Sequence, residues 1–461
     1  MEPELTDDVK TMLGSPRRAL FSMALPITAA NMLVCCNNLI DSVWLSGIGT
    51  AALAATGVVF PFFFLLMGMG NGIGVGAAQA IARHIGAKDY ETTHRLAAQA
   101  VCITGLIGIV TSVILLVLCR PLLVVAGAGD YLAESMMYAF PLFLCAPIIL
   151  LSLVFTSILR SEGAAKRMMY MSASGAVINM ILDPIFIYGF KFGVSGAAWA
   201  TSLSMAITLM FGIYWYFIKK DTFVRIPLKG FRFDKELDWD ILRVGIPASF
   251  EIIMVGIVTL VMNQLANRVD PVSGVAVFGT GWRIVDLLII PGMALGNAVV
   301  PIAAAAYGAK RLDKVKATFT CSVLYGFAIM VPIGVFTFLA APLITSLFTY
   351  SSSAEIADGL IYFLRTGGIF MPFTALAYSS YGLFQSMGMG VRSMTAVTAT
   401  NALRIPVCLV IMVFSATLTG LCQGTMIAEI VGSFLSFVWA SLVLRRVISS
   451  SDAGPSVPDA Q

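Results

Sequence analysis

The chain has 461 residues, of which 58% are hydrophobic and only 12% are charged, with a formal net charge of +4. Soluble domains carry about 25% charged residues, so this chain has too few polar side chains to cover a water-soluble surface. Together with a mean hydropathy of +0.90, the composition excludes a soluble globular protein and predicts a protein embedded in a membrane.

The N-terminal segment does not have the pattern of a cleavable signal peptide. Its first sixteen residues are polar and acidic, and the first long apolar run begins after Arg17 and Arg18. We therefore expect that run to remain in the protein as a spanning helix. The eight cysteines lie within apolar runs without CxxC spacing, and we expect them to form neither disulfides nor a metal site.

Short polar or glycine-containing breaks divide the apolar sequence into twelve expected helices. Several exceed the roughly 20 residues that a membrane span requires, so we expect these to be tilted or to protrude. The expected helices comprise residues 17–46, 51–82, 96–119, 130–159, 168–189, 194–218, 240–268, 274–306, 317–346, 354–386, 393–415 and 420–444.

Basic residues predict the orientation of these helices. Most of the 29 lysines and arginines lie on one side, before the first helix, after each even-numbered helix and in the stretch 219–239. The connections on the other side carry only Arg120, Lys191 and Arg268. The positive-inside rule therefore predicts that both termini are cytoplasmic, in a multi-pass protein of the plasma membrane.

The chain also resembles itself at an offset of about 222 residues, which predicts two halves with the same orientation. Gly86-Ala87-Lys88 matches Gly308-Ala309-Lys310, Pro26 matches Pro247, and the Asn-x4-Pro segment at 179–184 matches that at 401–406. We expect an all-α, V-shaped protein of two six-helix lobes, related by a pseudo-two-fold axis along the membrane normal, around a central cleft. The expected parts are an N-lobe (11–218), a cytoplasmic linker (219–239), a C-lobe (240–446) and a disordered tail (447–461).

Polar side chains within the expected N-lobe helices lie at a common depth. Asp41, Asp183 and Thr201 are each five to seven residues from the outer helix end, which at 1.5 Å per residue is roughly 8–11 Å. Asn179 precedes Asp183 by four residues and so lies on the same helix face. This set of oxygen atoms suits a hard cation, or a proton shared between the carboxylates. The alternative is that the polar groups only hold the helices together.

A proline follows Asp183 directly. Pro184 has no N–H to donate within its helix, which can free the carbonyl of Met180 as a further ligand.

Ionisable residues within the other expected helices are costly to bury, and therefore candidates for function. Glu251 is either a second titrating group or cation contact, or it pairs with an arginine such as Arg365 or Arg404. Arg283 and Asp286 are three residues apart on one helix, and we expect them to pair with each other. Glu429 is left without a predicted role.

Three segments and two short loops of the chain resemble the multidrug and toxic compound extrusion (MATE) transporters, most closely their archaeal, DinF-like branch. The resemblance covers about residues 15–445. Its specific features are the Asp of the first helix, the Asn-x3-Asp-Pro of the fifth and the Thr of the sixth. It is carried by the segments LPITAANMLVCCNNLIDSVWLSGIGTAALAATG (25–57), ILRSEGAAKR (158–167), INMILDPIFIYGFKFGVSGAAWAT (178–201) and the two GAK loops.

The resemblance implies roles for individual residues. A cation site, for Na+ or H+ as the coupling ion, is implied at Asp41, Asn179, Asp183 and Thr201. Tyr138 matches a tyrosine near that site, and Pro26 matches a proline at which the first helix can bend.

The C-lobe departs from the family pattern. Glu251 matches an acid used by many bacterial relatives, but their second acid is missing, because TALAYSSYGLFQSMG (374–388) contains no carboxylate. We therefore expect coupling to depend on the N-lobe.

The sequence as a whole predicts an antiporter that exports amphiphilic, cationic organic compounds by alternating access. The expected partners are such a substrate and membrane lipid, without nucleic acid or a cofactor, and the expected state is a monomer.

The first alternative is a lipid-linked oligosaccharide flippase of the same superfamily. This alternative predicts more helices and a cleft rich in arginine, to which Arg283, Arg365 and Arg404 would contribute. A membrane enzyme is disfavoured because the chain lacks HExxH, GxSxG and any His/Cys cluster. A channel is disfavoured by the internal duplication.

Overall fold

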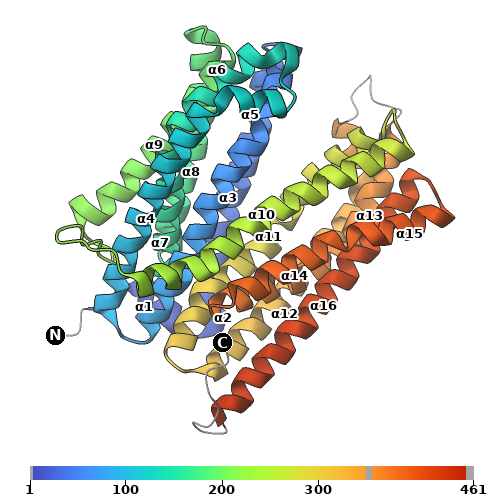
Figure 1. Ribbon diagram of the computed structural model, residues 1–461. Helices are drawn as coiled ribbons and strands as arrows, with labels where there is room; N and C mark the ends of the chain where they lie inside the picture. Colours follow the sequence, from blue (N-terminus) through green and yellow to red (C-terminus); the bar gives the residue numbers. More distant parts are fainter. Residues whose placement is uncertain (1–3, 349–355, 453–461) are drawn as a thin grey trace.

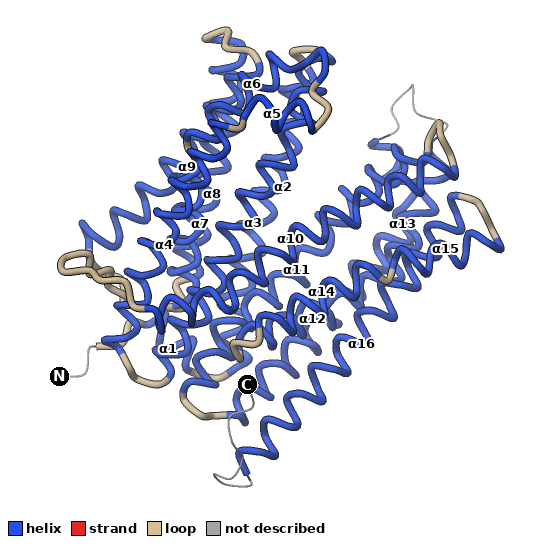
Figure 2. Tube along the Cα trace, in the orientation of Figure 1, coloured by secondary structure: helices blue, strands red, loops and turns tan. Residues whose placement is uncertain are grey.

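The computed structural model describes residues 4–348 and 356–452, and these residues form helices and loops without any strand (Figure 2). Among them, eleven helices are long and apolar enough to cross a membrane. The segments Gly129–Leu144 and Ala146–Ser161, which are bent by 51° relative to each other, make a twelfth span when counted together. The predicted all-α membrane protein is therefore confirmed.

The N-terminal half begins with a short helix that the sequence analysis did not anticipate, α1. The helices of this half are α1 (Asp7–Leu13), α2 (Pro16–Ser46), α3 (Thr50–Gly86), α4 (Tyr90–Val117), α5 (Cys119–Val125), α6 (Leu132–Leu144), α7 (Ala146–Ser161), α8 (Ala165–Pro184) and α9 (Val194–Ile213). A short 3-10 turn, η1 (Gly129–Tyr131), precedes α6, and π-helical turns, η2 (Ile185–Gly189) and η3 (Tyr214–Lys219), extend α8 and α9.

The C-terminal half contains α10 (Lys235–Val269), α11 (Gly274–Gly308), α12 (Leu312–Phe348), α13 (Ala357–Ser386), α14 (Gly390–Ala402), α15 (Arg404–Phe414) and α16 (Leu418–Asp452). Residues 354 and 355 of the expected tenth span lie outside the described residues. Because α16 continues to Asp452, the expectation that the tail is disordered from residue 447 is wrong for residues 447–452. The remainder of that tail also lies outside the described residues.

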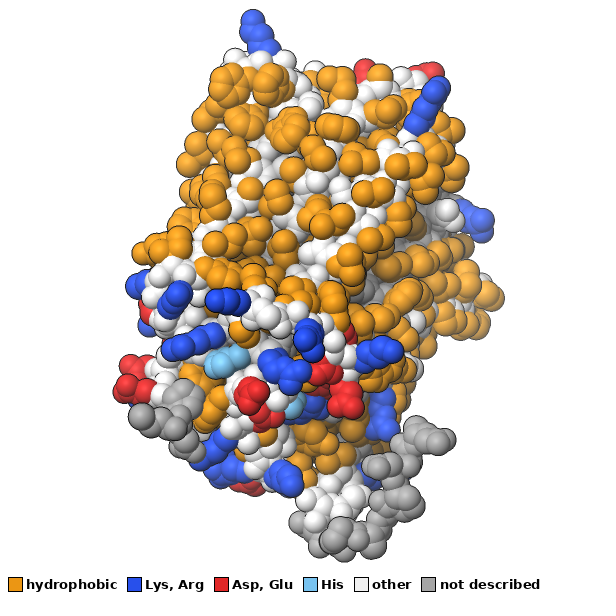
Figure 3. Space-filling view, turned by 60° about the vertical axis from the view of Figure 1, so that its left-hand side comes forward, with side chains coloured by type: hydrophobic (Ala, Val, Ile, Leu, Met, Phe, Trp, Pro, Cys, Tyr) orange, Lys and Arg blue, Asp and Glu red, His pale blue; other side chains and the backbone are white. Residues whose placement is uncertain are grey.

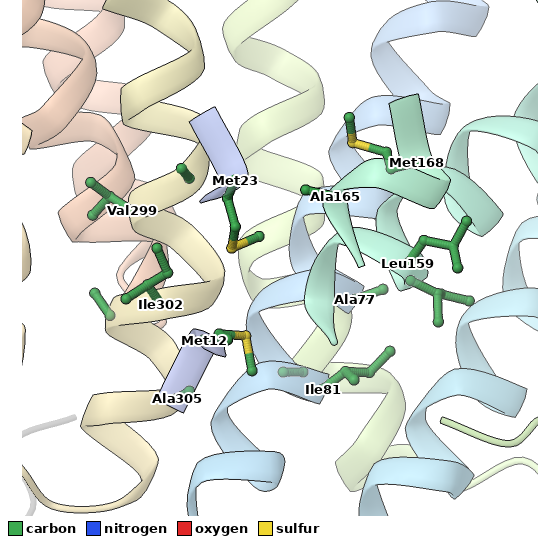
Figure 4. Close-up of a cluster of buried hydrophobic side chains, with 14 of the residues drawn as sticks. Met12, Met23, Ala77, Ile81, Leu159, Ala165, Met168, Val299, Ile302 and Ala305 are labelled. Atoms are coloured by element: carbon green, nitrogen blue, oxygen red, sulfur yellow. The ribbon is translucent and has the colours of Figure 1, made fainter. Parts of the chain in front are cut away.

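The helices form two lobes that adjoin at one end and diverge toward the other (Figure 1). α3 packs against α10 and α11, and α11 also packs against α2. The contact is apolar at its centre, where Met23 of α2, Ile81 of α3 and Ile302 of α11 are buried together (Figure 4). Burial of this apolar surface holds the two lobes together at the end where α1 begins and α16 ends.

The repeated Gly-Ala-Lys motif lies in this contact. A Cβ atom on Gly86 would lie 1.8 Å from the carbonyl oxygen of Ala305, and one on Gly308 would lie 1.8 Å from that of Arg83. Only glycine allows two helix ends to approach this closely. The glycine of each motif therefore allows the C-terminal ends of α3 and α11 to cross in close contact.

The surface has the polarity that a membrane requires. Figure 3 shows hydrophobic side chains over most of the length of the molecule, and basic, acidic and histidine side chains gathered toward its lower end. A belt of exposed apolar side chains is stable in lipid and costly in water.

Charged side chains add a second contact between the lobes at the same end. Arg83 of α3 pairs with Asp240 of α10, and the other carboxylate oxygen of Asp240 lies 2.6 Å from a guanidinium nitrogen of Arg243. Nε2 of His84 lies 3.9 Å from the same carboxylate. The Asp240 side chain is only 11% exposed, so it is a largely buried anion held between cations from both lobes.

We expect Asp240→Asn to loosen the contact between the lobes, because Arg83 and Arg243 would then repel each other without a counter-ion. Loss of one partner of a buried ion pair costs about 3 kcal/mol, which favours local opening by up to about 100-fold. Hydrogen–deuterium exchange at the adjoining ends of α3 and α10 measures this opening. The control is Lys10→Gln, which removes the exposed Lys10–Asp7 pair within α1; equal exchange in the two variants would contradict the prediction.

A buried carboxyl group attaches the 219–239 linker to the N-lobe. The N–H of Val224 donates to Glu162 at 2.8 Å and the hydroxyl of Tyr216 donates to it at 3.5 Å. Burial raises the pKa of Glu162 to about 8, although the N–H of Val224 and the charge of Arg167 oppose the rise.

We expect the stability of the protein to fall as pH rises from about 4.5 to about 8, because ionised Glu162 is disfavoured in the folded state. Glu162→Gln mimics the protonated carboxyl and should lose none of this stability. Its melting temperature should therefore exceed that of the wild type by a few degrees at pH 8 and by less at pH 5. Glu91→Gln, at an exposed position, is the control, and a pH-independent difference for Glu162→Gln would refute the assignment.

Candidate functional site

Four polar side chains of α2 and α8 meet inside the N-lobe. Nδ2 of Asn37 donates to Oδ1 of Asn179 at 2.8 Å, and Nδ2 of Asn179 donates to Oδ1 of Asp183 at 3.1 Å. The carboxyl groups of Asp41 and Asp183 are close enough to share a hydrogen bond. Asn179 is 4% exposed and Asp183 is fully buried. We call Asn37, Asp41, Asn179 and Asp183 the α2–α8 polar cluster.

Helical spacing brings these groups together. Asn37 and Asp41 are four residues apart on α2, as Asn179 and Asp183 are on α8, so each pair lies on one helix face. The two helices pack along their length, which puts the two faces in contact.

Three oxygen atoms of the cluster have no hydrogen-bond donor among the described residues. They are Oδ1 of Asn37, Oδ1 of Asp41 and Oδ2 of Asp183, and all three are buried. Leaving a buried acceptor unpaired costs about 1–3 kcal/mol, and two adjacent carboxylates cannot both stay charged without a counter-ion or a shared proton. The arrangement is therefore suited to accept either a small hard cation or a proton.

The backbone after Asp183 has the irregularity expected from Pro184. Pro184 has no N–H, and Ile185 donates its N–H to the carbonyl of Leu182. Pro184 therefore cannot donate to the carbonyl of Met180, four residues earlier, and the chain continues as the π-helical turn Ile185–Gly189. The carbonyl of Met180 stays a predicted further ligand.

The remaining predicted N-lobe residues lie at different distances from the cluster. Tyr138 of α6 is close enough to interact electrostatically with both carboxyl groups. Thr201 of α9 is half-buried, and its hydroxyl makes no hydrogen bond to the cluster within the described part of the chain. Pro26 is buried within α2, which is assigned as a single helix from Pro16 to Ser46. The structure therefore groups Asp41, Asn179 and Asp183, and the predicted ion-site role of these three residues and of Thr201 stays a prediction.

Glu251 lies in the C-lobe and does not pair with an arginine. Nε2 of Gln385 donates to it at 3.2 Å, and its other oxygen is buried without a donor among the described residues. The suggested partners have other contacts: Arg404 pairs with Glu429, and Arg365 lies over the ring of Phe338 at 5.7 Å. The alternative in which Glu251 pairs with Arg365 or Arg404 is therefore wrong.

The expected pair of Arg283 and Asp286 is also wrong. Both side chains are exposed, and no ion pair within 4 Å joins them in the described residues. Asp286 interacts instead with the charge of Arg404 on α15. Spacing on one helix permits such a pair, but an exposed pair gains too little to fix the two side chains together.

A family comparison connects this geometry with known proteins. The MatE family model matches residues 26–185 and 247–410, one segment in each lobe. The chain belongs to the MatE family.

Individual members of the family are similar over nearly their whole length. The multidrug export protein MepA of Staphylococcus aureus (strain MSSA476) is 27% identical over 378 residues, which cover 82% of each chain. A solved outward-facing conformation of a multidrug resistance MATE family transporter is 33% identical, covers 97% of this chain and 100% of its own, and superposes with a TM-score of 0.94. A transporter of the MOP superfamily from Pyrococcus furiosus Vc1, described by the reversed polarity of its binding pocket, is 34% identical with a TM-score of 0.92 over 96% of this chain and 99% of its own.

Membership of the MatE family confirms the resemblance seen in the sequence, and the similarity to solved MATE transporters confirms the all-α membrane fold. The chain is a multi-pass membrane transporter of this family and not an enzyme. Assignment to the archaeal, DinF-like branch stays a prediction.

Asn37 is the member of the polar cluster that the sequence analysis missed. The signal was present, because Asn37 precedes Asp41 by the same four residues that separate Asn179 from Asp183. Its neighbour Asn38 is exposed, and only the position on the helix distinguishes the two.

We expect Asn37→Ala to weaken cation binding, because it removes one of the three free oxygens and the donor to Asn179. Loss of one such group typically lowers the affinity of an ion site by about tenfold. Na+ that binds the folded protein raises its melting temperature, so a titration with Na+ measures the change. Asn38→Ala is the matched control. A wild-type melting temperature that responds to pH but not to Na+ would assign the cluster to protons, and a wild-type titration in Asn37→Ala would contradict the role of Asn37.

Proposed function

We propose that this MatE transporter exports amphiphilic, cationic organic compounds in exchange for Na+ or H+, and that the α2–α8 polar cluster is the coupling site. The observation that carries the proposal is the set of three buried oxygen atoms, from Asn37, Asp41 and Asp183, that have no donor among the described residues. The name of the relative MepA, a multidrug export protein, supports drug-like compounds as the substrate class.

The proposed ion step follows from the charge of the cluster. An ion that enters from the outer side neutralises Asp41 and Asp183, and removes the negative charge that attracts a cationic substrate. A ligand can shift a conformational equilibrium only by its differential affinity for the two states. The ion must therefore bind the outward-facing, substrate-free form more tightly than the other form.

The proposed conformational step is alternating access by rocking of the two lobes. Pro26 lies within α2 on the same helix as Asp41 and removes one backbone donor, so it is a suitable point for a bend when the cluster is neutralised. We further propose that the transporter works as a monomer in the plasma membrane, with both termini in the cytoplasm.

The flippase alternative receives less support. It requires arginines that face a lipid-linked anion together, whereas Arg404 pairs with Glu429 and Arg365 lies against Phe338. Arg283 and Arg365 are exposed, whereas Arg404 is half-buried in its pair with Glu429.

The decisive experiment is transport in proteoliposomes with the Na+ and H+ gradients imposed separately. We expect one of the two gradients to drive concentrative movement of a cationic dye by the wild type. Asp41→Asn and Asp183→Asn should each reduce this ion-driven transport by at least about 100-fold, because each removes a charge that the coupling ion neutralises.

The control is Asp130→Asn, which removes an exposed carboxylate at the outer end of the N-lobe and should transport like the wild type. Variants of Asp41 and Asp183 that insert normally and still couple transport to an ion gradient would refute the proposal.

A further inference from the structure

One carboxylate within a membrane-spanning helix has no role in the polar cluster. Asp286 lies on α11, the C-lobe helix that packs against α2 and α3 of the N-lobe. It is exposed, and it is close enough to interact electrostatically with Cys35 of α2 on one side and Arg404 of α15 on the other. Asp286 therefore lies on the side of α11 between the two lobes.

Arg404 does not neutralise this carboxylate. Its guanidinium pairs with Glu429, and the two side chains are only 11% and 7% exposed. The same guanidinium lies over the ring of Trp282, 4.4 Å from the ring centroid. Arg404 and Glu429 thus form a buried pair with no net charge. Of these three side chains, only Asp286 has a charge that the other two do not compensate.

No lysine or arginine lies within 4 Å of Asp286 in the described part of the chain. A charge at this depth of a membrane protein is costly unless a partner or water compensates it. Asp286 is therefore free to pair with a positively charged partner supplied from outside the chain.

The surroundings favour an organic cation over a metal ion. Na+ requires several oxygen ligands in a cage, as offered by the α2–α8 polar cluster, whereas Asp286 is one exposed carboxylate. Its neighbours include the half-buried ring of Tyr378. A diffuse organic charge needs only a single counter-ion and an apolar or aromatic surface beside it.

We propose that Asp286 is a C-lobe contact for the cationic end of the substrate. This inference rests on the proposed export of organic cations, and it adds a substrate contact separate from the ion site. The substrate then lies between Asp286 of one lobe and α2 of the other. When the coupling ion neutralises the α2–α8 polar cluster, the total negative charge that attracts the substrate falls. The ion does not bind at Asp286, so the substrate contact itself stays open.

Equilibrium binding of ethidium to the purified full-length transporter, followed by fluorescence anisotropy at fixed pH and Na+, tests the proposal. Asp286→Asn should weaken binding by about tenfold or more, because it removes the counter-charge. Asp286→Glu keeps the charge and should bind within about threefold of the wild type. Asp130→Asn, with its exposed carboxylate outside the interlobe region, should bind like the wild type.

Alkylation of Cys35 provides a readout that a purely structural role would not change. Ethidium held at Asp286 should slow the reaction of N-ethylmaleimide with Cys35, measured by mass spectrometry of fragments that separate Cys35 from Cys36. We expect this protection in the wild type and in Asp286→Glu, and its loss in Asp286→Asn at the same ethidium concentration.

The outcomes separate the two proposals. If the wild type binds ethidium and Asp286→Asn binds it equally well, the substrate contact is wrong while the proposed function stands. If Asp286→Glu fails to restore binding and both variants melt at lower temperature, Asp286 is structural and the inference is wrong. If Asp286→Asn changes only the pH dependence of transport, the residue carries a proton, which also overturns it. A wild type that binds no cationic dye would refute both proposals.

Discussion

The arrangement of the N-lobe depends on two carboxyl groups, Asp41 and Asp183, that lie beside each other away from water. Such a pair is stable only when a proton or a cation is shared between the two. Asn37 and Asn179 hold Asp183 through a chain of hydrogen bonds, and buried oxygen atoms of both helices are left without a hydrogen-bond donor among the described residues. α2 and α8 are therefore linked through a polar contact, and in the proposed function the strength of this contact varies with the ion that binds there. This is the physical property that a coupling site requires.

The second requirement of a transporter is a contact between lobes that can open. Here it combines apolar packing around Met23, Ile81 and Ile302 with a partly buried ion cluster at Asp240. The packing supplies most of the attraction, while the ion cluster ties α3 to α10 at one particular register. The close approaches at Gly86 and Gly308 allow this contact without filling it with side chains, so the seam is narrow and confined to one end of the molecule.

The duplicated halves have diverged in their charged groups. The N-lobe contains two neighbouring carboxyl groups with free oxygens, whereas the C-lobe contains Arg404 and Glu429, which satisfy each other. A buried neutral pair has no need of a mobile ion. Glu251 keeps one unpaired oxygen, but its neighbours are the neutral Gln385 and Ser393 and not a second acid. The physical asymmetry of the lobes is consistent with one exchanging ions and the other contacting substrate.

The sequence by itself determined the location in a membrane, the spans and the two-lobed fold. The reason is that the hydropathy pattern and the internal duplication can both be read from the order of residues along the chain. It also predicted that Asp41, Asn179 and Asp183 lie near one another, since helical spacing and depth follow from position along a helix. Only the tertiary structure decided the partners: Asn37 joins the cluster, Arg404 pairs with Glu429, and Arg283 does not pair with Asp286. Those contacts depend on which faces of distant helices meet, and spacing within a single helix carries no information about the helix opposite.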